Sequence, residues 1–179
     1  MSQIQLAALL LDYTRHPRAS IDGQNGRAIA AAMQAGVEMP AIIADRASKR
    51  VVDGFLRLLA ARKLGEETIH VIWRSYVSEA EIYLDAVHRN AGHGQRLTPY
   101  DQARCLLRAE ELHIAPSELA AALTMTVERL SDLRLRKLAT DPAARLIPIK
   151  GTLAGHGGLQ LSEREVLANE RASGMRPLF

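Results

Sequence analysis

Apolar and polar positions along the first half of the chain predict a small mixed α/β unit. Four short apolar runs have the length and composition of strands, at residues 4–12, 40–44, 50–53 and 68–73. Three further segments carry apolar residues at helical spacing, at residues 26–35, 55–64 and 78–90. The polar segment 45–49 is short enough for a hairpin loop, so we expect the second and third strands to pair.

The second half of the chain predicts helices as far as residue 138. A polar, glycine-rich linker at 91–96 precedes Thr98 and Pro99, which suit an N-cap and a first helical residue. Helices are expected at residues 100–112, 116–123 and 127–138. The last two, joined by a short turn, have the layout of a helix-turn-helix.

Particular residues support this helix-turn-helix. Ala120 is small where the two helices would cross, and Leu130 and Leu133 are expected to be buried on the second helix. The turn usually has glycine where Thr124 stands, at a position that often requires positive φ. We therefore expect a looser or differently shaped turn.

The chain becomes richer in glycine after Asp141. A short helix is expected at residues 162–172, and the apolar end at 174–179 either packs against a partner or frays. The predicted fold class is α+β. It comprises an α/β domain at 1–77, a connecting helix and helix-turn-helix bundle at 78–140, and a glycine-containing tail with a short helix at 141–179.

Composition narrows the class of protein. The hydrophobic content of 47% is ample for a packed core, and the single Cys105 indicates a reducing compartment. No secretory leader and no apolar run of about 18 residues is present, so we expect a cytoplasmic protein with no membrane partner. The net charge of +3 permits nucleic-acid binding without demonstrating it.

The segment 51–65 predicts a strand, a tight turn at Gly54 and a helix capped by Gly65. The N-terminus of such a helix presents unpaired backbone N–H groups and partial positive charge, which favour an anion. Arg57 in the first turn can bind a phosphate with two nitrogens. The alternative is an ordinary strand-to-helix turn with a solvated Arg57. Asp53 is the one candidate general base, and it equally suits a helix cap.

The second helix of the helix-turn-helix carries several cations beside two carboxylates. We expect its early residues near base edges and its later cations near phosphates. The alternative is a solvated charged face on a three-helix bundle. The candidate DNA-binding residues are Thr126, Glu128, Arg129, Ser131, Arg134, Arg136 and Lys137.

Several stretches, taken in order, resemble the ParB-type partition proteins of the ParB/sulfiredoxin superfamily. His16-Pro17-Arg18 resembles the early Asn-Pro-Arg signature, and residues 36–43 resemble the Gly-x-x-x-Pro-Ile-x-Val strand start. Residues 51–65 are similar to the phosphate-binding motif Asp-Gly-x-x-Arg-x-x-Ala-x-x-x-Leu-Gly. The resemblance covers about residues 4–138, and the helix-turn-helix follows in the family's order.

This resemblance implies a site for a nucleoside triphosphate, CTP in partition proteins, with Mg²⁺. Asn90 would be a metal-facing ligand, with His93 or Arg96 in place of the family's arginine. Phe55 and Leu56 replace the Glu-Arg pair of the partition motif and the Cys-His pair of sulfiredoxin, which argues against sulfiredoxin chemistry and against efficient hydrolysis. The implied nucleotide-binding residues are Gly36, Pro40, Asp53, Gly54, Phe55, Leu56, Arg57, Asn90, His93 and Arg96.

Three functions stay open. The first is a ParB-like DNA-binding protein, CTP-responsive and homodimeric, in partition or transcriptional regulation, with residues 174–179 in its dimer interface. The second is a phosphotransfer or nucleotide-hydrolysing enzyme of the same superfamily, at most a weak CTPase or NTPase. The third is an interaction module with a degenerate pocket, which the loss of the motif's polar residues favours.

Overall fold

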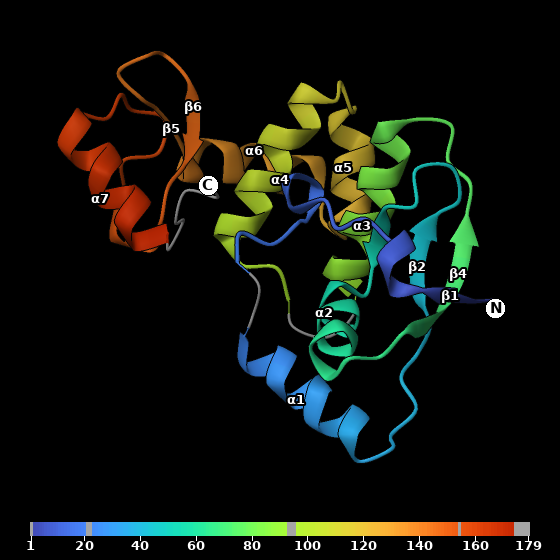
Figure 1. Ribbon diagram of the computed structural model, residues 1–179. Helices are drawn as coiled ribbons and strands as arrows, with labels where there is room; N and C mark the ends of the chain where they lie inside the picture. Colours follow the sequence, from blue (N-terminus) through green and yellow to red (C-terminus); the bar gives the residue numbers. More distant parts are fainter. Residues whose placement is uncertain (1, 21–22, 93–95, 154, 174–179) are drawn as a thin grey trace. The chain divides into compact units, whose positions relative to one another are not determined.

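The computed structural model describes residues 2–20, 23–92, 96–153 and 155–173 (Figure 1). The chain divides into two compact units. The first comprises Met1–His16 and Ile21–Ala86, and the second comprises Pro17–Ser20 and Val87–Phe179.

The first unit is built on a four-stranded mixed sheet in the order β1-β4-β2-β3. Its strands are β1 (Ser2–Gln5), β2 (Ile42–Asp45), β3 (Val51–Asp53) and β4 (Thr68–Arg74). β2 runs parallel to β4, and the other two pairings are antiparallel. Ile43 lies opposite Asp53 and Ala44 opposite Val51, which confirms the expected pairing of the second and third strands.

β2 is buried along its whole length because helices cover both faces of the sheet. Ile42 and Ala44 pack in a cluster with Leu58 of α2 (Phe55–Leu64). Ile43, on the other face, packs with Ile82 of α3 (Glu79–Gly92). This alternation follows from the two-residue period of a strand. The helix α1 (Gly23–Gln34) packs against α2 (Figure 1).

The first strand is shorter and earlier than the expected residues 4–12. After β1 the chain forms two 3₁₀ turns, η1 (Leu6–Ala8) and η2 (Tyr13–Arg15). Leu6 and Leu9 are both buried in the same core cluster. Residues three apart point to opposite faces of a strand, so a 3₁₀ turn is needed to bury both. The Arg62 guanidinium donates to the carbonyls of Leu6 and Leu9, at 3.1 and 2.8 Å.

The second unit contains the end of α3 and three further helices that match the predicted ones. These are α4 (Pro99–Glu111), α5 (Pro116–Ala122) and α6 (Val127–Lys137). Thr98 caps α4 as expected, since its hydroxyl accepts from the Asp101 N–H at 3.1 Å while the Asp101 carboxylate accepts from the Thr98 N–H at 3.0 Å. This reciprocal capping box fixes the start of α4.

A short hairpin follows α6 directly and was not predicted. β5 (Leu138–Thr140) pairs antiparallel with β6 (Leu146–Pro148), and η3 (Gly151–Leu153) and α7 (Glu163–Ser173) complete the unit. The expected helix at 162–172 is confirmed as α7. Leu138 was expected to end α6, but it is the first residue of β5. Each strand has three residues, too few for periodicity to distinguish a strand from a helix end.

The glycine-rich stretch at 151–158 contains a tightly packed segment. A Cβ added at Gly157 would lie 2.3 Å from the Leu135 carbonyl oxygen, so only glycine allows this approach to the backbone of α6. The Gly158 N–H donates to the Leu138 carbonyl at 2.7 Å, and the Ile149 N–H donates to Lys137 at 2.8 Å. These contacts fasten the C-terminal end of α6 to the elements that follow it.

Candidate functional site

The turn between β3 and α2 requires glycine for two reasons. Gly54 has φ +100° and is the N-cap of α2, and no side chain caps this helix. A Cβ at Gly54 would lie 2.5 Å from Cγ2 of Ile42, so the turn backbone packs directly against β2. The predicted strand, turn and helix with Gly65 as its left-handed cap are confirmed. The first N–H groups of α2 are left for water or a ligand.

Arg57 is held by the protein itself. Its Nη1 donates to the carbonyls of Pro40 and Ala41 at 2.8 and 3.2 Å, and its Nη2 donates to the Asp53 carboxylate at 2.7 Å. The side chain is 16% exposed, so it is not the solvated arginine of the alternative interpretation. Asp53 is likewise used by Arg57. Phosphate binding by Arg57 therefore stays a prediction, and it requires exchange of at least one of these contacts.

Phe55 and Leu56 direct their side chains into the fold. Phe55 is buried, its ring 4.4 Å from that of His16 and edge-on to that of Tyr13 at 6.0 Å, centroid to centroid. Leu56 faces α1, where a Cβ at Gly26 would meet it at 3.4 Å. Only the backbone N–H groups of these two residues can serve an anion at the helix start.

Gly36 and Pro40 line a cavity of about 250 Å³ at one end of the sheet. Glu38, Glu66 and His70 are among its polar residues. Two carboxylates disfavour phosphate here and suit a group that donates hydrogen bonds, such as an exocyclic amine. Pro40 connects the two features, because its carbonyl is bound by Arg57.

An ion-pair network that the sequence did not reveal joins η2, the residue before β3, and the start of α3. Arg50 Nη1 contacts both carboxylate oxygens of Glu79 at 2.8 and 2.9 Å, and Arg15 contacts Glu79 and Asp12. Burial raises the pKa of Asp12, but hydrogen bonds from Thr14 and the charges of the two arginines outweigh burial and lower the pKa. Glu79 is far apart in sequence from Arg15 and Arg50, so no spacing pattern indicated these pairs.

The third family motif falls in the second unit. Asn90 lies on α3 and is half-buried, Arg96 is exposed before α4, and His93 lies outside the described residues. Within the described ranges, no group of three or more His, Cys, Asp or Glu side chains is placed to hold a metal ion. The roles of Asn90 and Arg96 at a nucleotide stay predictions.

The helix-turn-helix is formed by α5 and α6. Thr124 has φ +56°, so the left-handed position where glycine is usual is occupied by a β-branched residue. The Met125 N–H donates to the Ala120 carbonyl at 2.9 Å, and Ala120 is buried as expected. Leu130 is buried, but Leu133 is only half-buried, which corrects the expectation that both are buried. Leu133 lies about 60° around the helix from Leu130, at the flank of the buried stripe.

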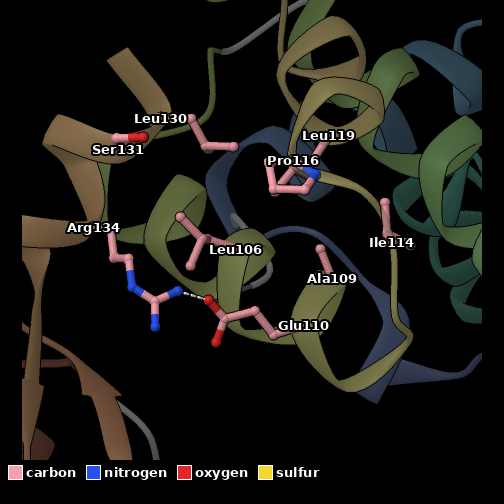
Figure 2. Close-up of a pocket in the computed structure, with 9 residues that line it drawn as sticks. All are labelled: Leu106, Ala109, Glu110, Ile114, Pro116, Leu119, Leu130, Ser131 and Arg134. Atoms are coloured by element: carbon pink, nitrogen blue, oxygen red, sulfur yellow. Dashed lines mark ion pairs between the residues drawn. The ribbon is translucent and has the colours of Figure 1, made fainter. Parts of the chain in front are cut away.

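The candidate DNA-binding residues of α6 fall into two groups. Glu128, Arg129 and Arg136 are exposed, and Thr126 is the N-cap that accepts from the Arg129 N–H at 3.2 Å. Arg134 instead turns toward α4 and pairs with Glu110 (Figure 2). Lys137 is half-buried. The two groups point in different directions because successive residues of an α-helix are rotated by about 100° around its axis.

A small apolar cavity of about 90 Å³ lies between α4, α5 and α6. Leu106, Leu119 and Leu130 line it, and Ser131 and the Arg134–Glu110 pair lie at its rim (Figure 2). The Ser131 hydroxyl donates to the Val127 carbonyl at 3.1 Å, within its own helix. The cavity is smaller than an engineered apolar cavity of roughly 150 Å³ that binds benzene.

Comparison with known proteins identifies two regulators. No family model matches the chain. It is 32% identical over 103 residues to the transcriptional regulator NovG of Streptomyces niveus, covering 58% of this chain and 32% of NovG. It is also 32% identical over 105 residues to a possible regulatory protein of the streptomycin biosynthesis operon of Streptomyces griseus. This match covers 59% of this chain and 30% of the relative. The matches span about a third of each relative.

Solved structures decide the fold. ParB from Caulobacter crescentus, C-terminally truncated and complexed to the centromeric parS site, superposes with a TM-score of 0.54 at 13% identity, over 75% of this chain and 71% of that one. The pNOB8-like ParB N-domain superposes with a TM-score of 0.51 at 15% identity, over 82% of this chain and 52% of that one. The chain has a ParB-like fold. The Caulobacter protein complexed with CTP-gamma-S matches at a TM-score of 0.47, with 13% identity over 75% of this chain and 77% of that one.

Residues 51–65 form the strand, turn and helix that the resemblance implied, with Phe55 buried and Leu56 half-buried. A nucleotide at the start of α2 stays a prediction. No helix in the described part of the chain combines the length and apolar character that crossing a membrane requires.

The Gly54 turn gives a first prediction. Gly54→Ala should destabilise the protein by about 1–2 kcal/mol for the left-handed backbone, with a further clash against Ile42. Gly65→Ala is the matched control, because Gly65 has φ +76° and no atom within 4 Å of an added Cβ. Denaturant unfolding of both variants measures the difference. Equal losses would show that the contact with Ile42 does not constrain the turn.

The Thr124 turn gives a second prediction. Thr124→Gly should stabilise the protein by up to about 1 kcal/mol, because glycine adopts this backbone without steric cost. Thr124→Val keeps the branched Cβ and should give no gain. Thermal unfolding compares the two variants. A loss of stability in the glycine variant as large as in the valine variant would contradict the left-handed turn.

Proposed function

We propose that this chain is a ParB-like DNA-binding protein that acts in partition or transcriptional regulation, with a nucleotide site in its α/β unit. The observation that carries the proposal is the helix-turn-helix of α5 and α6, formed around a left-handed Thr124 within a ParB-like fold. The second helix leaves Arg129 and Arg136 exposed for contact with DNA.

Both kinds of comparison support DNA as the partner. The Caulobacter ParB of the same fold is complexed to the parS site, and the two sequence relatives are described as regulators. The last turn of α6 also carries Arg134, Arg136 and Lys137. Cations near the C-terminal end of a helix are favoured by its dipole and suit phosphates beside a groove. Homodimeric binding to paired half-sites is part of the proposal.

The α/β unit supplies the features that a triphosphate needs. Uncapped N–H groups at the start of α2 suit phosphates, and the cavity at Pro40 suits a base with an amino group, as in CTP. Mg²⁺ would neutralise the phosphates. Arg57 would turn from a backbone carbonyl to a phosphate oxygen while keeping its pair with Asp53.

Binding is favoured over hydrolysis. A water-activating base must be available to accept a proton, and Asp53 is held by Arg57 at 2.7 Å. Phe55 and Leu56 add no polar group beside the helix start. The enzyme alternative is therefore limited to a weak CTPase or NTPase activity.

DNA binding is tested by fluorescence anisotropy on random duplex across a salt series. Arg136→Ala should weaken binding to all sequences and lower the salt slope by roughly 1, because one phosphate contact is lost. Arg27→Ala on α1 removes the same charge from an exposed position and should leave the slope unchanged. Negligible affinity of the wild-type protein at low salt would rule out the DNA-binding function.

Nucleotide binding is tested by calorimetry with the four nucleoside triphosphates and Mg²⁺. CTP should bind, and Arg57→Gln should weaken it about tenfold to a hundredfold, since a charge-assisted contact is worth about 1.5–3 kcal/mol. Melting of the variant without nucleotide separates lost affinity from lost stability. If none of the four binds, the α/β unit is an interaction module with a degenerate pocket.

A further inference from the structure

We infer that Glu128 is a specificity-determining residue, which lowers the affinity of α6 for non-specific duplex and makes it select cytosine in the major groove. Asp132 lowers the same affinity by pairing with Arg136. The inference rests on the DNA-binding function proposed above. It concerns the face of α6 opposite to the one that packs in the bundle.

Helix geometry places both carboxylates on that outward face. Leu130 marks the inward side, since it is 4% exposed. Glu128 and Asp132 stand two residues before and after it, so each points about 160° away from Leu130. Leu135, 66% exposed, lies on the same outward side. A helix that enters a groove presents this face to the base edges.

The charged residues on the inward side of α6 are not directed to base edges. Arg134 is paired with Glu110 of α4 at the rim of the apolar cavity (Figure 2). Lys137 is half-buried. The outward face is therefore left with Arg129 and Arg136 beside two carboxylates, and its charges balance.

The two carboxylates have different partners. The Thr126 hydroxyl and the backbone N–H of Glu128 itself donate to the Glu128 carboxylate, and the pKa of that group is lowered by these hydrogen bonds. Glu128 lies in the first turn of α6, which the proposed binding mode places near base edges. Asp132 accepts from Nε of Arg136 at 2.8 Å, which orients that guanidinium on the outward face.

The chemistry of the groove then sets the preference. A carboxylate only accepts hydrogen bonds, and in the major groove guanine and thymine present acceptors where cytosine presents its N4 amino donor. Adenine also presents an amino donor, at N6, but its N7 acceptor lies beside it and repels the second carboxylate oxygen. Where the base pair offers no such donor, the negative charge of Glu128 is repelled by the nearby phosphates. The arginine beside it suits the guanine of the same or the next base pair. Glu128 therefore lowers affinity for most sequences and tolerates a site with cytosine at its position.

A carboxylate in the first turn of a helix also stabilises the helix through its dipole. This structural role alone would change stability and leave base preference untouched. The chain offers a matched control, because Glu163 is an exposed carboxylate in the first turn of α7. Glu163→Gln removes the same charge from the same kind of position.

The experiment selects bound duplexes from a randomised library with wild-type protein, Glu128→Gln and Glu163→Gln, and measures their affinities for random duplex. Glu128→Gln should raise affinity for random duplex on the order of tenfold, because a like charge is removed from the phosphates. It should also lose the cytosine preference at one position, or transfer it to adenine, which a glutamine reads. Glu163→Gln should match wild type in both measurements.

Asp132→Asn is a second variant, which should also raise affinity for random duplex because it frees Arg136 from its pair. If Glu128→Gln binds random duplex as tightly as the wild-type protein and keeps its base preference, the inference is overturned while the DNA-binding function stands. No binding by any protein at low salt would overturn the DNA-binding function and the inference with it. Thermal unfolding of each variant verifies that the compared proteins are folded.

Discussion

The close packing of the Gly54 backbone against the side chain of Ile42 is the constraint on which the first unit depends. The contact leaves no room for a Cβ, and the positive φ at Gly54 turns the chain from β3 into α2 over the start of β2. Arg57 binds the carbonyls of Pro40 and Ala41 across this junction. The start of α2, where an anion would bind, is therefore positioned by packing within the sheet and not by a capping side chain.

A comparable backbone contact governs α6 in the second unit. Gly157 lies against the Leu135 carbonyl, and the Ile149 and Gly158 N–H groups bind the Lys137 and Leu138 carbonyls that end the helix. These bonds satisfy carbonyls that a helix terminus would otherwise expose. The hairpin and α7 thus belong structurally to the helix-turn-helix. They restrict how far the end of α6 can move.

Ion pairs within each unit decide which charged residues are available to a ligand. Asp53 and Arg57 bind each other, and Arg134 binds Glu110, so none of these four groups is simply solvated. Arg129 has a different position, exposed in the first turn of α6. The type and spacing of a residue make it a candidate for binding. Its partners in the folded protein determine which contacts a ligand must displace before it can bind that residue.

The expected change of turn shape did not occur in the backbone of Thr124, which takes the left-handed conformation usual for glycine. The sequence alone predicted the order of strands and helices along the chain as far as residue 138, the pairing of the second and third strands, the glycine turn at 54 and the boundaries of α4 to α6 to within a few residues. These features depend on local steric and capping preferences, which act between neighbours in the chain. The sequence also indicated the ParB-like fold. The family's motifs occur in the expected order even where single residues differ, as at Phe55. It missed the β5–β6 hairpin, because three-residue strands carry no measurable period.

Only the tertiary structure decided the roles of the charged residues. Arg15 and Arg50 both pair with Glu79 although they are far from it in sequence. Arg134 pairs with Glu110 of α4, whereas Arg136 pairs with Asp132 of its own helix. Electrostatic partners depend on distances in space, which local pattern does not encode. The sequence therefore determined which elements form and which residues are candidates, while packing between elements determined which of those candidates are paired within the protein and which are exposed.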